Sequence, residues 1–422
     1  MNILMMTNTY LPHVGGVTNS VAAFTKELRN QGHHVMVVAP EYKQAIVDPD
    51  VIRIPAIQNF NGSDFSVVLP IPGFLKNRLE EFKPDIVHSH HPFLVGSTAL
   101  RISTKCHTPL VYTYHTMFEK YTHYVPVDFP RMKHFVISLS IGYSNMADTV
   151  IAPSESVAEF LKSKKMESPI EVVPTGIDTA KFKSGDGRKV RASCNIPPDA
   201  FVAGHVGRLA PEKNLDFLSE AAASFLHSWP DAHFIIVGYG SLETTLKEFF
   251  IENNLQDRVH FLGKLRGRDV VDAYHAMNVF IFSSKSETQG LVLTEAMAAG
   301  VPVIALDASG VREVVDDCVN GCLLFEENVR AFTRELSQFC RMTPETRKRL
   351  TANAVKTAEG FTLKNSVSKL LLLYERLKKE RVSKRTRDES VWKKSIEHIK
   401  MEWDLFSNIS SAVGDAIQKH KY

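Results

Sequence analysis

The sequence predicts an α/β protein with two tandem Rossmann-like domains that face each other across a cleft, followed by a helical C-terminal extension. Three observations lead to this prediction. The chain has 422 residues, 44% of them apolar, which is more than one hydrophobic core usually organises. Short apolar runs typical of buried parallel strands recur in both halves, each followed by a polar turn and a helical pattern. A long amphipathic helical pattern and a basic segment end the chain.

We place the first domain at residues 1–172. Its strands are expected at 3–7, 35–39, 85–88, 110–114 and 149–152, and a helix is expected at 17–30. The turn before that helix contains Gly15 and Gly16, which either let backbone approach a ligand closely or form an ordinary tight turn. The pair does not match the dinucleotide fingerprint G-x-G-x-x-G, so the sequence disfavours a nicotinamide cofactor.

Histidines follow two of these strands. His88, His90 and His91 end one strand, and His115 ends the next. Ligands of open α/β sheets gather at the carboxyl ends of strands, so this edge is a candidate binding region. For the first three histidines we favour structural hydrogen bonds over a metal site. His115 lies in a loop rich in aromatic and polar residues and is the stronger candidate for a role in chemistry.

The second domain is placed at residues 173–360, and the polar stretch that follows Asp178 is interpreted as a linker. Strands are expected at 201–206, 233–237, 259–262 and 279–282, and Gly238 directly follows the second of these. Arg208 and Lys213 lie five residues apart in the first strand-to-helix loop. Two cations beside the free N–H groups of a helix start suit a diphosphate, although such cations are often merely solvated.

The stretch 283–302 combines a polar loop and a Leu- and Ala-rich helix after the apolar run 279–282. Glu287 falls in the loop, the helix is expected to begin after Gly290, and Glu295 follows about two turns into the helix. The helix start suits a phosphate, and the two carboxylates suit the hydroxyl groups of a nucleotide sugar. The alternative is an ordinary strand–loop–helix unit with solvated glutamates.

The composition excludes several classes of protein. The formal net charge is only +3, which gives no general attraction for nucleic acid. The five cysteines are scattered and lack the spacing of a zinc site, so we expect reduced thiols in a cytosolic protein. No run is long and apolar enough to span a membrane, and the first residues do not have the pattern of a signal peptide.

The C-terminal part, residues 361–422, is expected to hold a long helix at 361–379 and a basic amphipathic tail. Between residues 376 and 394 there are nine Lys or Arg side chains against three acidic ones. An apolar helical face that begins within this stretch carries Trp392 and Trp403. This pattern is typical of a helix that lies on an anionic lipid surface, although a terminal helix that docks on the protein itself has similar features.

Taken together, Gly15 and Gly16, Arg208 with Lys213, and the Glu287-x7-Glu295 unit resemble glycosyltransferase family 4, which contains retaining transferases of the GT-B fold. The resemblance covers roughly residues 1–380. It implies that the second domain binds a nucleotide-sugar donor, that the first binds the acceptor, and that the helix at 361–379 crosses back to the first domain.

The resemblance also implies residue roles, each carried over to the matching position. Arg208 and Lys213 are expected to neutralise the donor diphosphate, and Glu287 is expected to contact the transferred sugar. The other expected donor-site residues are the backbone N–H groups of Gln289, Gly290 and Leu291, the ribose ligand Glu295, and Gly15, Gly16 and Gly238. His115 is expected near the anomeric centre. No cofactor or metal is expected, because the cations replace the metal and no DxD-type carboxylate pair is present.

A narrower likeness, over 90–96, 113–116 and 121–126, is to the members of the family that glycosylate diacylglycerol. It implies an acceptor side formed by His91, Tyr114, Tyr121 and Tyr124. We therefore expect transfer of a hexose from UDP-glucose to a lipid such as 1,2-diacylglycerol, by a cytoplasmic enzyme bound peripherally at the inner face of the cell membrane. The alternatives are a soluble or polysaccharide acceptor, a sugar-nucleotide epimerase, and a catalytically idle protein that binds lipid or nucleotide.

Overall fold

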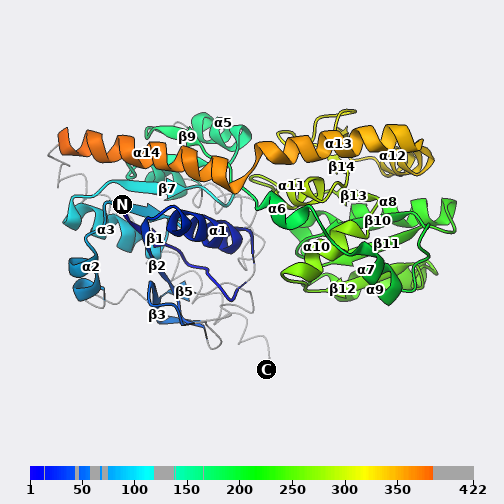
Figure 1. The fold of residues 1–422 in the computed structure, drawn as a ribbon, viewed down its shortest axis with the longest axis horizontal. Helices are drawn as coiled ribbons and strands as arrows, with labels where there is room; N and C mark the ends of the chain where they lie inside the picture. The colour runs from blue at the N-terminus through cyan, green and yellow to red at the C-terminus, as the bar shows by residue number, and fades with distance from the viewer. Residues whose placement is uncertain are drawn as a thin grey trace, which may run out of the picture.

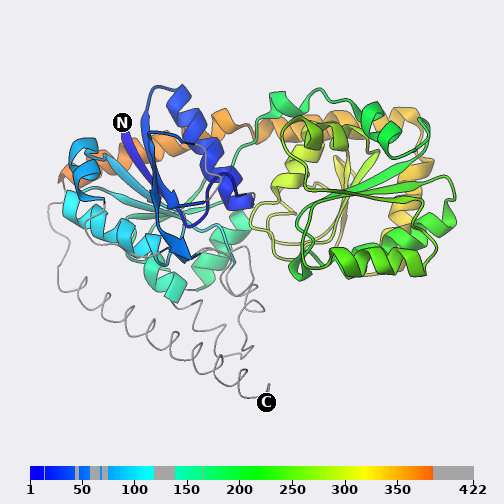
Figure 2. The same cartoon turned by 90° about the horizontal axis from the view of Figure 1, so that it is seen from below.

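The computed structural model describes residues 1–13, 15–42, 47–57, 67–68, 75–117, 137, 139–164 and 166–383. Two parallel sheets lie in two domains side by side, and helices cover both faces of each sheet (Figures 1 and 2). Most strands are apolar and fully buried, as expected for sheets that are covered on both sides.

The N-terminal domain is built on a seven-stranded sheet in the order β3-β2-β1-β6-β7-β8-β9, with every pair parallel. Its strands are β1 (Asn2–Met6), β2 (His34–Pro40), β3 (Val51–Ile54), β6 (Ile86–Ser89), β7 (Leu110–Thr113), β8 (Thr149–Ala152) and β9 (Ile170–Val172). The antiparallel pair β4 (Ala56–Ile57) and β5 (Val67–Val68) is separate from it. The five strands expected in this half are therefore confirmed.

The helices of this domain form a layer on each face of the sheet. One face packs against α1 (Gly16–Asn30), through Val21, Phe24 and Leu28. The other packs against α2 (Lys76–Phe82), α3 (Val95–Cys106) and α5 (Glu155–Ser163). The apolar residues of α1 recur at the helical spacing seen in the sequence, which explains why the helix lies along the sheet.

The C-terminal domain has a six-stranded parallel sheet in the order β12-β11-β10-β13-β14-β15. Its strands are β10 (Val202–Val206), β11 (His233–Val237), β12 (Val259–Gly263), β13 (Val279–Phe282), β14 (Val303–Leu306) and β15 (Gly321–Leu324). The helices around them are α8 (Leu215–Ser228), α9 (Glu243–Glu252) and α12 (Val329–Arg341) on one face, and α10 (Arg268–His275) and α11 (Leu291–Ala298) on the other.

The stretch after Asp178 is not a structureless linker, and here the sequence interpretation was wrong. It forms two short helices, α6 (Thr179–Phe182) and α7 (Gly187–Ser193). Asp178 and Asp186 cap them by accepting hydrogen bonds from the backbone N–H groups of Lys181 and Lys189. Phe182 is buried in the core of the C-terminal domain, so tertiary packing outweighs the polar composition.

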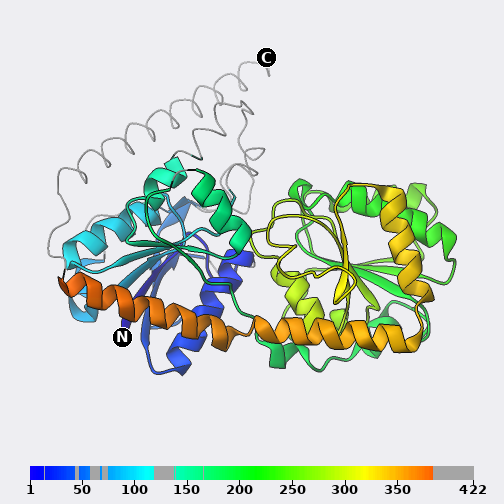
Figure 3. The same cartoon turned by 90° about the horizontal axis from the view of Figure 1, so that it is seen from above.

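The last described helices carry the chain from one domain back to the other. Helix α13 (Pro344–Gly360) packs on the C-terminal domain, and α14 (Leu363–Ser383) continues along the N-terminal domain (Figure 3). Leu370, Leu373 and Tyr374 of α14 join the same buried cluster as α1. The expected return of this helix to the first domain is confirmed. Among the described residues, no helix combines the length and apolar character needed to cross a bilayer.

Candidate functional site

In both sheets the strand order reverses at one point, between β1 and β6 in the N-terminal domain and between β10 and β13 in the C-terminal domain. The loops that leave the carboxyl ends of strands at such a point are the usual ligand-binding region of open α/β sheets. In the C-terminal domain these loops carry Arg208 and Lys213 after β10, and Glu287 after β13.

Lys213 and Glu287 form an ion pair, with 2.5 Å between Nζ and Oε1. Each side chain is only 15% exposed. Burial alone would raise the pKa of Glu287, but the charge of Lys213 and hydrogen bonds from Lys213 and Ser284 outweigh it, so the pKa lies below its ordinary value. The pair therefore places a cation and a carboxylate together at the switch point.

Serine hydroxyls join the two loops that hold this pair. Ser283 Oγ donates to the carbonyl oxygens of Lys213 and Asn214, at 2.9 Å each. Ser284 and Ser286 each have Oγ 3.3 Å from the carbonyl oxygen of Glu212 and donate to it. These bonds fix the short 3₁₀ turn η4 (Pro211–Lys213) against the end of β13 and so set the position of Lys213.

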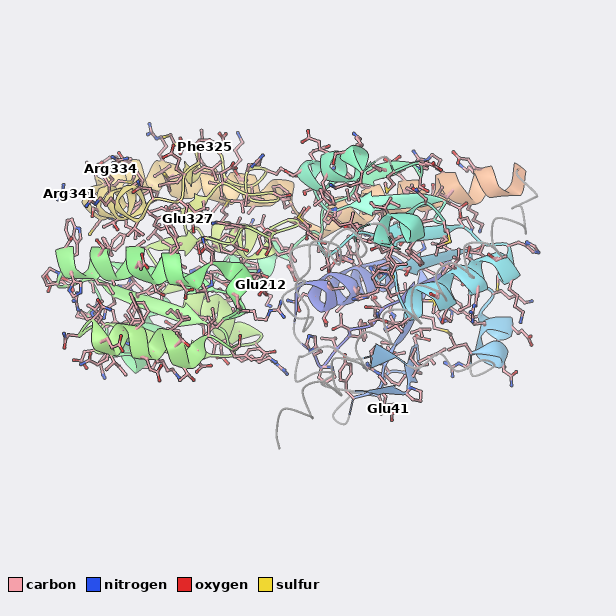
Figure 4. The ribbon with its side chains drawn as sticks, turned by 180° about the vertical axis from the view of Figure 1, so that it is seen from behind. Glu41, Glu212, Phe325, Glu327, Arg334 and Arg341 are labelled. Carbon is pink, nitrogen blue, oxygen red and sulfur yellow. The ribbon has the colours of Figure 1, made fainter. Side chains whose placement is uncertain are left out.

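Arg208 lies near this pair but is held differently. Its guanidinium donates to Glu212 Oε1 at 2.6 Å, and its own side chain is 39% exposed whereas that of Glu212 is 2% exposed. Figure 4 shows Glu212 at the edge of the C-terminal domain that is nearest the N-terminal domain. Arg208 therefore presents its charge to solvent at the edge where the domains meet, while its orientation is set by a buried carboxylate.

Helix α11 begins at this edge, as the sequence predicted. Gly290 precedes it with φ +70°, and a Cβ there would lie 2.8 Å from Leu293, so another residue would be strained. Leu291 is the first helical residue, and the N–H groups of the first turn lack partners within the helix. An anion that binds here meets the positive end of the helix dipole.

Glu295 lies on α11 at the side of this edge and has a partner that the sequence analysis missed. The Tyr274 hydroxyl of α10 donates to Glu295 Oε2 at 2.9 Å. Burial raises the pKa of Glu295 above its ordinary value, and the hydrogen bond from Tyr274 opposes this only in part. No local sequence signal joins the two residues, because they lie 21 positions apart on different helices.

Two other expected donor-site residues, Gln289 and Gly238, also have structural roles. The side-chain amide of Gln289 makes two hydrogen bonds to the backbone of Thr175, with its Oε1 2.6 Å from the Thr175 nitrogen. Gly238, at φ +145°, packs so closely that a Cβ would lie 1.8 Å from the carbonyl oxygen of Gly207. A glycine is required there to bring the ends of β10 and β11 together.

The N-terminal domain contacts this region directly. The Thr288 hydroxyl donates to the carbonyl oxygen of His115 at 3.2 Å, and Arg266 donates to the carbonyl oxygen of Pro12 at 3.3 Å. Gly15 caps the start of α1, and a Cβ at Gly16 would meet nothing within 4 Å. The carboxyl edges of the two sheets therefore meet, with the glycine turn and His115 on one side and residues 283–290, the donor loop, on the other.

The histidines at this edge form a group connected by hydrogen bonds and ring contacts. His88 bonds to Tyr374 and Thr113, with 2.6 and 2.7 Å between the ring nitrogens and the hydroxyl oxygens. His90 Nδ1 lies 2.9 Å from His115 Nε2. Burial lowers the pKa of His88 to about 3 and holds the pKa values of His90 and His115 well below their usual range. Within the described residues, no group of three or more His, Cys, Asp or Glu side chains is arranged to hold a metal.

The described acceptor-side residues are buried. Tyr114 is fully buried and packs against Tyr112 and Phe160, and its assignment to the acceptor side stays a prediction. Tyr112 and Tyr114 share one face of the extended chain, because alternate residues point the same way. His91 is buried, and its Nδ1 accepts the backbone N–H of Asn8. Tyr121 and Tyr124 lie outside the described residues.

Comparison with known families agrees with this geometry. The model of Glycosyltransferase Family 4 matches residues 14–181, and the model of Glycosyl transferases group 1 matches residues 186–357. A protein named alpha-monoglucosyldiacylglycerol synthase from Streptococcus pneumoniae is 31% identical over 342 residues, 78% of this chain and 76% of that protein. A protein of the same name from Acholeplasma laidlawii is also 31% identical, over 78% of this chain and 85% of that protein.

Other relatives carry other names. A GDP-mannose-dependent alpha-mannosyltransferase from Mycolicibacterium smegmatis is 30% identical over 77% of this chain and 84% of that protein. Among solved structures, Anabaena Alr3699/HepE in complex with UDP superposes with a TM-score of 0.73 at 21% identity, over 89% of this chain and 100% of that one. Each domain of this chain matches a family model. The chain therefore belongs to the GT-B glycosyltransferases of family 4 and is a hexosyltransferase.

Proposed function

We propose that the enzyme transfers glucose from UDP-glucose to 1,2-diacylglycerol with retention of the anomeric configuration, and so forms an alpha-glucosyl glycolipid. The observation that carries the proposal is the buried Lys213–Glu287 pair beside the first turn of α11. A cation and a helix start suit the donor diphosphate, and a carboxylate next to them suits the hydroxyl groups of the sugar. The names of the two relatives at 31% identity support the choice of glucose and diacylglycerol.

In this proposal the donor residues act at the bond that breaks. The C1–oxygen bond of the donor breaks, and negative charge develops on the leaving diphosphate. Arg208, Lys213 and the start of α11 stabilise that charge, which is the kind of electrostatic contribution that dominates many enzymes. Glu287 binds the sugar, Glu295 binds the ribose, and Gly16 approaches the diphosphate from the N-terminal domain.

The acceptor hydroxyl then forms the new bond to C1 on the face from which the diphosphate leaves. Its proton passes to an oxygen of the leaving phosphate, so atoms and charge balance without a covalent enzyme intermediate. The ion pair with Lys213 keeps Glu287 ionised but also engages it, which makes it a poor nucleophile. We also propose that no Mg²⁺ is required, because Arg208 and Lys213 supply the positive charge; unchanged turnover in a chelator such as EDTA tests this.

We place the enzyme at the cytoplasmic face of the cell membrane, bound peripherally. The support is the basic and Trp-containing sequence of the tail, which suits an anionic lipid surface. Residues 384–422 of that tail lie outside the described part of the chain. The names of the glycolipid-synthase relatives point in the same direction, since a diacylglycerol acceptor resides in a membrane.

A panel of labelled nucleotide sugars on anionic vesicles that contain diacylglycerol tests the proposal. Labelled lipid from UDP-glucose supports it. Labelled lipid from GDP-mannose instead would move the donor toward that of the mannosyltransferase relative. Release of nucleotide without labelled lipid would contradict the acceptor, and conversion of the donor to another sugar nucleotide without acceptor would identify an epimerase. No turnover, with donor binding unaffected by Lys213→Ala, would identify an idle binding protein.

A further inference from the structure

Three side chains from three neighbouring strands form a chain of contacts beneath the site. Met5 lies on β1, His90 directly follows β6, and His115 lies two residues after β7. His90 Nε2 lies 3.2 Å from Met5 Sδ, and His90 Nδ1 lies 2.9 Å from His115 Nε2. The two imidazole rings are stacked with 5.2 Å between their centroids. The backbone N–H of His90 also donates to Met6, which fixes the position of the ring.

The chemistry of sulfur determines which nitrogen of each histidine carries the proton. A thioether has no hydrogen to donate and acts only as a weak acceptor. His90 is therefore bonded to Met5 only if the proton of its ring sits on Nε2. Its Nδ1 is then an acceptor, so the proton between the two histidines belongs to His115 Nε2. In the opposite arrangement a lone pair of His90 Nε2 would face the lone pairs of Met5 in a buried site, which is unfavourable.

Each of the two rings carries one proton, so each has one donor and one acceptor nitrogen. Burial keeps the pKa values of both histidines well below their ordinary value, and the neighbouring His88 and His91 rings lower the pKa of His90 further. At neutral pH both rings are therefore neutral, and each has one N–H and one lone pair. His88 does not compete for the proton of His90, since its two nitrogens bond to Tyr374 and Thr113.

We propose that His90 is a positioning residue, oriented by Met5, that holds His115 in the Nε2–H tautomer and leaves the lone pair of His115 Nδ1 free to accept a hydrogen bond from a sugar hydroxyl. His115 is partly exposed where the domains meet, and its carbonyl oxygen bonds to Thr288 of the donor loop. The role of the lone pair rests on the proposed function, because the hydroxyl belongs to the transferred hexose. The tautomer itself rests only on the contacts with Met5 and His90.

A pair of matched substitutions on β1 tests this inference. Met5→Leu removes the acceptor while nearly conserving volume, whereas Met6→Leu makes the same change one residue along the strand, in the core on the opposite face of the sheet. Nitrogen NMR of histidine-labelled protein, with His115 assigned by its own substitution, reads the tautomer without any turnover. We expect the Nε2–H form in the wild type and in Met6→Leu, and a mixture of both forms in Met5→Leu.

Kinetics on the same variants then test the consequence. Met5→Leu is expected to lower kcat about threefold, as for loss of one weak hydrogen bond, with little change in the KM for donor. His90→Leu is expected to lower kcat further, and His90→Asn to restore part of it, because its amide oxygen offers an acceptor to His115 Nε2.

A wild-type His115 protonated on Nδ1, or identical His115 spectra in Met5→Leu and wild type, would overturn the tautomer assignment. A changed tautomer with unchanged kcat would overturn the role of the lone pair. If diacylglycerol is not the acceptor, the NMR result is unaffected, so the two proposals fail separately.

Discussion

Lys213 and Glu287 form an ion pair that is largely buried. Removing one charge therefore leaves the other buried without a partner of opposite charge. Lys213→Met leaves Glu287 buried without its cation and removes a positive charge from the proposed leaving group. We expect kcat/KM to fall by a factor on the order of 100 or more, and the free energy of unfolding to fall by roughly 3 kcal/mol. Steady-state kinetics and urea unfolding measure the two effects.

The pH dependence of stability distinguishes the loss of the ion pair from a loss of packing. In the wild type the pKa of Glu287 is depressed, so its contribution is present above the unfolded value of about 4.3 and is lost as the pH falls through the lower folded value. In Lys213→Met burial prevails and raises the pKa, so stability should instead be lost as the pH rises. Lys285→Met is the control, because its partner Glu327 is exposed and the pair is worth at most about 1 kcal/mol. Equal pH profiles for the two variants would contradict this account.

The sequence pointed to the charged residues Lys213, Glu287 and Glu295 but not to the contacts that hold them. Lys213, Glu287 and Glu295 were found because each lies in a strand-to-helix unit whose loop has a recognisable pattern. Tyr274 was not, because it meets Glu295 only through packing of α10 against α11. The burial of Tyr114 is likewise not visible in the sequence, because an aromatic residue after a strand has the same local pattern whether it points into the core or out of it.

Helix α5 has its first turn capped from the other domain. Ser154 accepts the N–H of Val157, and the carboxylate of Glu313 accepts the N–H groups of Glu155 and Ser156, at 2.7 Å each. Glu313 also accepts the Ser156 hydroxyl at 2.5 Å. We expect Glu313→Ala to cost about 1 kcal/mol, as for loss of a helix cap. Hydrogen exchange at the amides of Glu155 and Ser156 should become faster while exchange at Val157 changes less.

Glu326→Ala is the matched control, since that exposed glutamate has no side-chain hydrogen bond within the described residues. Unchanged exchange at Ser156 in Glu313→Ala would mean that the two domains do not hold this contact in solution. Contacts of this kind were beyond the sequence, because the residues lie more than 150 positions apart. The boundaries of most strands could be predicted, because the apolar runs place them within one or two residues. Helices α6 and α7 were missed, because capping and packing outweigh their polar composition.

In the described part of the chain, the two domains are connected at the carboxyl edges of the sheets and through α14, which packs on the N-terminal domain. At the edges, Gln289 of the donor loop bonds to Thr175, whose hydroxyl bonds in turn to Ser20 of α1 at 2.9 Å. Along the other side, Arg376 bonds to Glu171 and Lys378 to Asp85, at 2.6 and 2.7 Å. The Arg376–Glu171 pair is exposed and the Lys378–Asp85 pair is only partly buried, so both contribute little, and apolar packing must hold α14 in place.

That packing predicts that the stability of the N-terminal domain depends on helix α14. Val367, Leu370, Leu373, Tyr374 and Leu377 are at most 6% exposed and complete the core formed by α1 and β1. A chain that ends at residue 360 would expose this apolar face, which favours aggregation or loss of cooperative unfolding. We expect it to elute as aggregates or to lose the N-terminal unfolding transition, measured by size-exclusion chromatography and thermal unfolding. A chain that ends at residue 383 keeps α14 and should unfold like the full chain. The difference in vesicle binding between these two chains then measures the contribution of residues 384–422. If the chain that ends at 360 remained monomeric and cooperative, α14 would be an accessory helix and the core of the N-terminal domain would be complete without it.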